Sequence, residues 1–250
     1  MKILIDAGHN CKNFDTGCVG KISKEQDLTF EIAKSLYDIL KKNGHAAHLT
    51  RRTKTEILGS GTVNSSLAKR AEICNAINPD LFLSIHINSG GGTGCEAYVY
   101  EKSGASLEFA QKCVAEMQKI GRVSRGVKSA PFYVLKNTNA PAVLFEAGFI
   151  DNTAEEKWLC ENTYAVANAL YNAVFRKTDY PTATEAVAIL QKCQIISDAE
   201  KWYNGTWNDA DFKWLLRKTG HILTKRRKDD IMSEKGELAK AESKRLRFDP

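Results

Sequence analysis

The chain has 250 residues, 43% hydrophobic and 26% charged, which suffices for one full-sized globular domain with a smaller unit beside it. Its net charge of +6 is mild, so we predict no nucleic-acid partner, although attraction to any anionic polymer stays compatible with it. Every apolar run is too short to span a bilayer, so we also predict no membrane partner.

The N-terminal segment MKILIDAGHN has only a three-residue apolar run, Ile3 to Ile5, before Asp6, which is too short for a secretory signal. We therefore expect synthesis in the cytoplasm without a signal peptide, and release by another route for any action outside the cell. The seven cysteines include no CxxC pair, which argues against a structural thiolate zinc site. Cys74 and Cys113 fall in helical apolar patterns and are expected to pack as small buried hydrophobes.

Strand and helix patterns alternate through the first 175 residues. The predicted strands are Lys2–Ile5, Ala46–Thr50, Leu81–Ile87, Glu96–Tyr100, Phe132–Leu135 and Ala142–Phe145. The predicted helices are a segment from a capping box at Ser23 and Gln26 to a C-cap at Gly44, then Leu67–Ile77, Ser106–Ile120 and Ala154–Phe175. This order is typical of an α/β fold with a twisted, mainly parallel sheet flanked by helices.

A composition change at Asp179-Tyr180-Pro181-Thr182 predicts a linker after a first domain at 1–177. Beyond it, 184–223 is predicted to be a small helical module, with helices at Glu185–Lys192 and Asp209–Lys218 and three of the four tryptophans. Residues 224–250 form a charged tail. The module is expected to contact a cell wall or to self-associate, and the oligomeric state is left open.

Two histidines lie at the ends of predicted strands. His9 follows the first strand, and His86 lies near the end of Leu81–Ile87. Because ligands bind at the carboxyl ends of parallel strands, these side chains are expected to converge. Two imidazoles with one carboxylate and an open position form a catalytic zinc arrangement, so we predict a Zn²⁺ site. His45, His48 and His221 are interpreted as structural.

Two glutamates are candidates to complete the site. Glu25 begins the first helix, where a carboxylate by itself would simply complement the helix dipole. Glu146 interrupts the apolar run Ala142–Phe145, where a charge needs a partner or a function. Its alternatives are an ion pair with an arginine or a general base of raised pKa.

Other catalytic motifs are weaker. The segment Gly90–Gly94 is glycine-rich, but it lacks the lysine and the following helix of a phosphate-binding loop. The sequence contains neither HExxH nor GxSxG. A Cys–His nucleophile pair stays open, with no specific support.

A series of segments in order carries a resemblance over about residues 1–176. They are ILIDAGHN, TGCVG, the Glu25 helix, Thr50-Arg51, Arg70-Ala71 with Asn75, DLFLSIHIN and PAVLFEAGFIDN. Together they resemble the zinc-dependent N-acetylmuramoyl-L-alanine amidases of phage endolysins and bacterial autolysins. That resemblance implies His9, Glu25 and His86 as zinc ligands and Glu146 as the catalytic residue. Asn10, where the family commonly has a second glycine, and the loop from Lys54 to Val63 depart from the pattern.

The resemblance implies hydrolysis of the amide between N-acetylmuramic acid and L-alanine of peptidoglycan, giving cell-wall lysis. The alternatives are a zinc peptidase or deacetylase acting on another peptidoglycan bond, or a non-catalytic wall-binding relative. Action on the wall would follow release by phage lysis or by lysis of a mother cell.

Overall fold

The computed structural model describes residues 1–175, 187, 190–191, 195–197 and 214–215. Within the chain, Met1–Arg176 forms one compact unit, which is described here by itself. The predicted module at 184–223 lies almost wholly outside the described residues, and the tail at 224–250 lies wholly outside them. In the described part, every helix is too short or too polar to cross a membrane.

Six strands form one sheet in the order β2-β1-β3-β6-β4-β5. Their bounds are β1 Lys2–Ala7, β2 Ala46–Leu49, β3 Leu81–Asn88, β4 Cys95–Val99, β5 Ser124–Ser129 and β6 Ala142–Phe149. The pairings are parallel except that of β4 with β6, which is antiparallel. The predicted fold class, a mainly parallel sheet flanked by helices, is confirmed.

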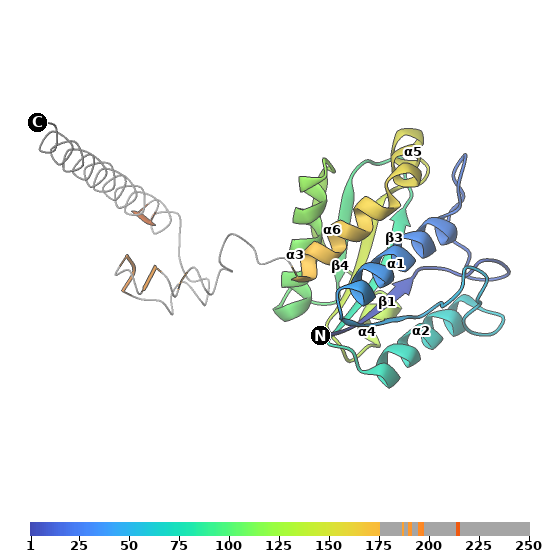
Figure 1. The fold of residues 1–250 in the computed structure, drawn as a ribbon, viewed down its shortest axis with the longest axis horizontal. Helices are drawn as coiled ribbons and strands as arrows, with labels where there is room; N and C mark the ends of the chain where they lie inside the picture. The colour runs from blue at the N-terminus through green and yellow to red at the C-terminus, as the bar shows by residue number, and fades with distance from the viewer. Residues whose placement is uncertain (176–186, 188–189, 192–194, 198–213, 216–250) are drawn as a thin grey trace, which may run out of the picture. The chain divides into compact units, whose positions relative to one another are not determined.

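Helices cover both faces of this sheet (Figure 1). They are α1 Glu25–Lys42, α2 Val63–Ile77, α3 Gly104–Lys119, α4 Tyr133–Lys136, α5 Thr153–Glu161 and α6 Thr163–Phe175. The larger core lies between the sheet and α1, α3, α5 and α6, and a smaller core lies on the opposite face under α2 and α4. Cys74 and Cys113 are fully buried in these cores, as predicted.

Three local predictions are wrong, and one strand was missed. The segment predicted as the strand Phe132–Leu135 contains helix α4, since a short apolar run cannot distinguish the two structures. Strand β5 was not predicted, because SRGVKS is a half-exposed edge strand without apolar alternation. The predicted helix Ala154–Phe175 is split at Asn162, whose side chain donates to the Trp158 carbonyl.

The predicted capping box at Ser23 is the third wrong prediction. The N-cap of α1 is Lys24, and it makes no side-chain capping bond. The Ser23 hydroxyl instead donates to the buried Glu156 carboxylate at 2.8 Å, in a contact that spans 133 residues. The C-terminal end of α1 fits the prediction better, since Gly44 follows the cap residue Asn43 with a positive φ of 78°.

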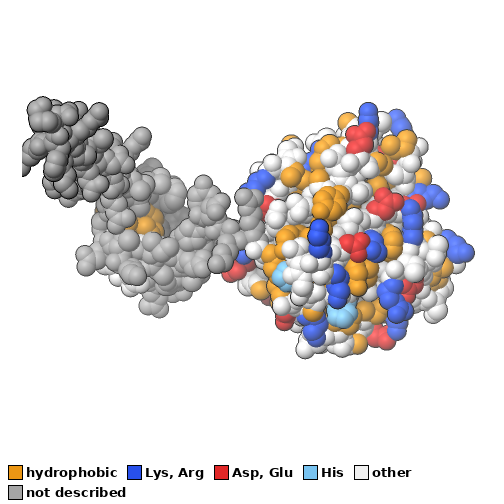
Figure 2. All heavy atoms as spheres, viewed as in Figure 1, with side chains coloured by type: hydrophobic (Ala, Val, Ile, Leu, Met, Phe, Trp, Pro, Cys, Tyr) orange, Lys and Arg blue, Asp and Glu red, His pale blue; other side chains and the backbone are white. Residues whose placement is uncertain are grey.

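On the face of the molecule that Figure 2 shows, lysine, arginine and acidic side chains are interspersed over the described unit. Charges of both signs at short separations partly cancel one another's fields at a distance. The long-range field over this face is therefore weak.

A buried ion pair joins α2 to β1. Nη1 of Arg70 lies 2.5 Å from Oδ1 of Asp6, and both side chains are almost fully buried. Thr50 and Ser84 donate to the same carboxylate at 2.6 and 2.7 Å. The pKa of Asp6 is lowered because Arg70 and these hydroxyls outweigh the effect of burial. Asp6 is therefore ionised in the core.

Removing one partner of this ion pair should leave the other charge buried without a counter-ion. We expect Arg70→Met to lower the free energy of unfolding by about 3–5 kcal/mol. Urea unfolding measures this, with Arg52→Met as the matched control, because the Arg52 side chain is 82% exposed and its loss should matter little. A decrease no larger than that of the control would contradict a structural role for the pair.

Candidate metal centre

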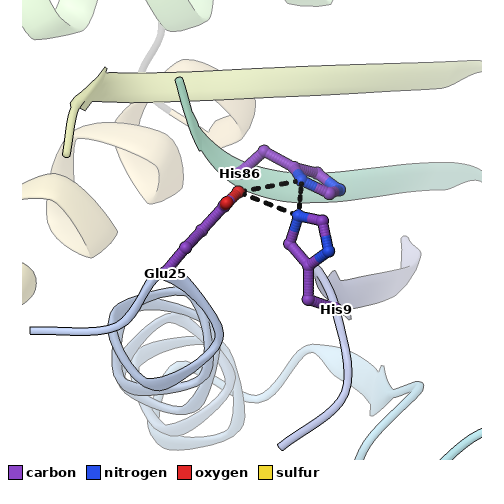
Figure 3. Close-up of side chains that lie close together, drawn as sticks. All are labelled: His9, Glu25 and His86. Carbon is purple, nitrogen blue, oxygen red and sulfur yellow. Dashed lines mark hydrogen bonds and ion pairs between the residues drawn. The ribbon is translucent and has the colours of Figure 1, made fainter. Parts of the chain in front are cut away.

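The three predicted ligand residues meet at the carboxyl edge of the sheet (Figure 3). His9 comes from the loop after β1, Glu25 is the first residue of α1, and His86 lies on β3. Nε2 of His9 lies 3.0 Å from Oε1 of Glu25 and 3.2 Å from Nδ1 of His86. Nδ1 of His86 is 3.2 Å from the same carboxylate oxygen. Three potential ligand atoms thus form a small triangle.

The loop that carries His9 is held by buried guanidinium groups. Arg70 donates to the carbonyl oxygens of Ala7 at 2.8 Å and of His9 at 2.7 Å. Arg51 donates to the Gly8 carbonyl at 3.3 Å and to that of Gln26, in α1, at 2.9 Å. His9 itself has a φ of +64°, which is unfavourable for a residue with a Cβ. The two arginines hold this turn by satisfying its carbonyl groups.

Asp15 orients the His9 ring. Its Oδ1 lies 3.2 Å from Nδ1 of His9, and its Oδ2 accepts from the Ser66 hydroxyl at 2.5 Å. A carboxylate at one ring nitrogen favours a proton there and leaves the lone pair on the other. Nε2, which faces Glu25 and His86, is therefore the ring nitrogen that can bind a metal once it loses its proton. Sequence reasoning missed Asp15, which lies in an irregular loop without a periodic pattern.

The Glu25 carboxylate is fixed by backbone amides. Oε1 accepts from the Ile87 N–H at 3.1 Å, and Oε2 accepts from the Cys18 N–H at 2.9 Å. Burial alone would raise the pKa of Glu25, but hydrogen bonds with His86 and His9 and their charges lower it well below its usual range. Glu25 is thus a fixed anion that faces two imidazoles.

This triangle fits a small divalent cation. Ligand atoms at about 2.0–2.1 Å from a tetrahedral zinc lie about 3.3 Å from one another, close to the 3.0–3.2 Å separations here. Two imidazole nitrogens with one carboxylate also match the ligand types that zinc prefers. The His9 and His86 side chains keep 21% and 16% of their surfaces exposed, so a fourth position can open to solvent.

The same geometry attracts a proton when no metal is bound. Burial alone would lower the pKa of His9, but the hydrogen bonds and charges of Asp15 and Glu25 raise it to about 10. The centre therefore favours a bound cation, either a proton or a metal ion.

Glu146 lies beside this triangle, directly opposite His86 in the pairing of β3 with β6. Its Oε2 is buried without a hydrogen-bond partner among the described residues. Burial raises the pKa of Glu146 to about 8, with further contributions from the charges of Glu25 and Glu96. The alternative of an ion pair with an arginine finds no support in the described part of the chain. A carboxylate without a partner can instead accept a proton from a small molecule at the site.

His45 and His48 do not join the centre. His45 follows α1 and stacks on Phe175 of α6, with ring centroids 3.7 Å apart. His48 lies in the edge strand β2 and is exposed. His221 lies outside the described residues.

The glycine-rich segment is held by acidic residues after β6. Asp151 accepts from the N–H groups of Gly90 and Gly91 at 2.6 and 2.8 Å, and Glu155 accepts from Gly94 at 3.0 Å. This loop is thus tied to the end of the strand that carries Glu146.

The sequence profile of the N-acetylmuramoyl-L-alanine amidases matches residues 3–176. The chain belongs to this amidase family. It is 36% identical over 167 residues to the sporulation-specific N-acetylmuramoyl-L-alanine amidase of Bacillus subtilis (strain 168), covering 66% of this chain and 62% of that protein. It is also 36% identical over 171 residues to the endolysin of Bacillus phage SPP1, covering 65% of this chain and 59% of that protein.

Solved amidase structures share the fold. The N-acetylmuramoyl-L-alanine amidase from Clostridium difficile 630 aligns with a TM-score of 0.63 and 29% identity, covering 72% of this chain and 98% of that one. The expected amidase family is confirmed. The chain spans only about three-fifths of the length of the two relatives from Bacillus and its phage.

Gly8 leaves space for the predicted ligand residue His86. A Cβ at Gly8 would lie 2.6 Å from Cε1 of His86 and 2.7 Å from the Ile85 carbonyl oxygen. We expect Gly8→Ala to lower the free energy of unfolding by about 1–3 kcal/mol through overpacking, and to displace the His86 ring. Urea unfolding measures the first effect and zinc titration the second. Unchanged stability together with unchanged zinc affinity would contradict this close packing.

Proposed function

We propose that the protein hydrolyses the amide between N-acetylmuramic acid and L-alanine of peptidoglycan, with zinc held by His9, Glu25 and His86. The observation that carries this proposal is the triangle of ligand atoms with the unpartnered Glu146 carboxylate beside it. Family membership supports the choice of bond. The names of the sporulation-specific relative and the phage endolysin support action on the cell wall after release.

At such a centre, zinc supplies Lewis-acid polarisation of an oxygen atom. The residues of the chain orient and hold the groups that would bind it. Asp15 holds the proton of His9 at Nδ1 and so keeps Nε2 available as a ligand. The amides of Cys18 and Ile87 keep the Glu25 carboxylate in place as substrate enters. The site is therefore preorganised on rigid elements.

Glu146 would act as the general base and then as the acid. Its carboxylate takes a proton from the attacking water, whose oxygen forms a bond to the carbonyl carbon. The C–N bond then breaks, and Glu146 returns the proton to the departing amine. The products are the lactyl carboxylic acid of the sugar and a stem peptide with a free L-alanine amino group.

Zinc binding should depend on pH with a definite sign. Since the pKa of metal-free His9 is about 10, zinc must displace a proton from it at neutral pH. The apparent zinc affinity should therefore rise with pH, about tenfold per unit between pH 6 and 8. Competition with a chelator measures this, and zinc should restore activity after chelation whereas magnesium should not. Affinity independent of pH would contradict the proton competition.

Replacing the base should separate chemistry from metal binding. We expect Glu146→Gln to lower kcat by at least about 100-fold, because the amide cannot accept the proton, while zinc content stays unchanged. Glu161→Gln, at the exposed end of α5, is the matched control and should keep full activity. Near-normal turnover by Glu146→Gln would exclude Glu146 as the base.

Mass analysis of digested muropeptides distinguishes the bond that is cut. An amidase releases intact stem peptides beginning at L-alanine and leaves an unsubstituted glycan. A peptidase would cut within the stem, and a deacetylase would remove acetyl groups only. A wall-binding relative would leave the muropeptides unchanged while still sedimenting with the wall.

A further inference from the structure

A second buried carboxylate lies next to the proposed base. Glu96 is 1% exposed and is paired directly opposite Glu146 in the ladder of β4 with β6. Its Oε1 accepts from the Asn88 amide at 2.9 Å and from the Tyr98 hydroxyl at 2.6 Å. Its Oε2 accepts from Nε of Arg125 at 2.7 Å and from Nζ of Lys128 at 2.6 Å. One carboxylate thus gathers two cations from β5.

The two cationic side chains carry more positive charge than the single Glu96 carboxylate neutralises. In the described part of the chain, Arg125 and Lys128 make no ion pair except the one with Glu96. Each side chain is 40% exposed, and each makes one hydrogen bond to Glu96, which leaves the two terminal nitrogens of Arg125 and two N–H groups of Lys128. Phe149 and Tyr98 lie 4.9 and 5.7 Å from the respective charged groups. Glu96 and the two aromatic rings therefore hold Arg125 and Lys128 in place, while their remaining N–H groups stay available as hydrogen-bond donors.

The distance from the proposed metal centre suits a peptide. His86, Glu146 and Glu96 occupy one row across the neighbouring strands β3, β6 and β4. Strands are spaced by about 4.8 Å, so Glu96 lies about 10 Å from His86 along this row. An extended peptide rises about 3.3 Å per residue, so 10 Å corresponds to about three residues. A group in the second or third residue beyond the scissile amide would reach the two cations.

We propose that Arg125 and Lys128 form a subsite for a carboxylate of the stem peptide, two or three residues beyond the scissile amide. This inference rests on the proposed function. It assigns the stem peptide, and not the glycan, to the surface over β4 and β5. Glycan built from N-acetyl sugars is neutral away from its peptide, whereas a stem peptide carries carboxylates. Guanidinium and ammonium groups with spare donors bind carboxylates through charge-assisted hydrogen bonds. The peptide is therefore the occupant that complements this charge.

The test compares acid and amide versions of one substrate. The set consists of N-acetylmuramoyl tripeptides with all carboxylates free, or with that of the second or the third residue amidated. With the full-length zinc-loaded protein, at least one amidated substrate should show about tenfold lower kcat/KM, mainly through KM. Arg125→Gln or Lys128→Gln should remove this preference, and Arg125→Lys should restore part of it. Each single variant leaves Glu96 one cationic partner.

Lys34→Gln is the matched control. Lys34 pairs with Asp38 at 2.6 Å, its side chain is 45% exposed, and it lies on α1. This variant should keep the full preference for the acid. If the Arg125 and Lys128 variants lost kcat/KM equally on the acid and the amide substrates, the two residues would have a structural role, and the proposal would be overturned. So would a wild-type protein that treats all three substrates alike.

A binding measurement separates this inference from the proposed function. Calorimetry on Glu146→Gln with the same acid and amide ligands reports the carboxylate preference without turnover. Absence of hydrolysis by the wild type with a retained binding preference would reject the reaction but keep the subsite. Hydrolysis without any binding preference would keep the reaction and reject the subsite.

Discussion

The turn after β1 depends on two guanidinium groups that replace the hydrogen bonds of the sheet. Arg70 and Arg51 reach this turn from different segments and donate to three consecutive carbonyl groups, those of Ala7, Gly8 and His9. A buried carbonyl without a partner would cost about 1–3 kcal/mol, so each of these bonds matters. The left-handed φ of His9 is sustained by them, and that conformation turns the ring toward β3 and α1. The proposed metal centre therefore depends on arginines that do not touch the metal.

The fold was largely predictable because the central strands are nearly continuous apolar runs. Leu81–Ile87 and Ala142–Phe145 match the buried strands β3 and β6, and a parallel sheet buries both faces of such strands. Prediction failed where local sequence carries little information. The edge strand Ser124–Ser129 is stabilised by pairing with β4 and not by its own composition. Ser23 was misread because its partner, Glu156, is distant in sequence.

The site was predictable to the extent that strand ends specify it. His9 and His86 follow from position and residue type together, and the structure brings them together as expected. The position of Glu25 in a first helical turn gave no such indication, because that location alone is explained by the helix dipole. Asp15 and Glu96 were missed for one reason: their functions arise from contacts across the fold, to His9 and to β5 respectively. No periodicity along the chain encodes such contacts.

Glu146 lies between two carboxylates, and this position links the proposed base to the metal. The charges of Glu25 and Glu96 add to burial in raising its pKa to about 8, so without metal it holds a proton at neutral pH. Glu96 is already neutralised by cations from β5, so its repulsion is partly relieved. A divalent cation between His9, Glu25 and His86 would relieve the other repulsion and lower the pKa of Glu146. Loading of the metal and ionisation of the base are therefore coupled through electrostatics. Under the proposed function, loss of the metal would therefore also leave Glu146 protonated and unable to act as a base.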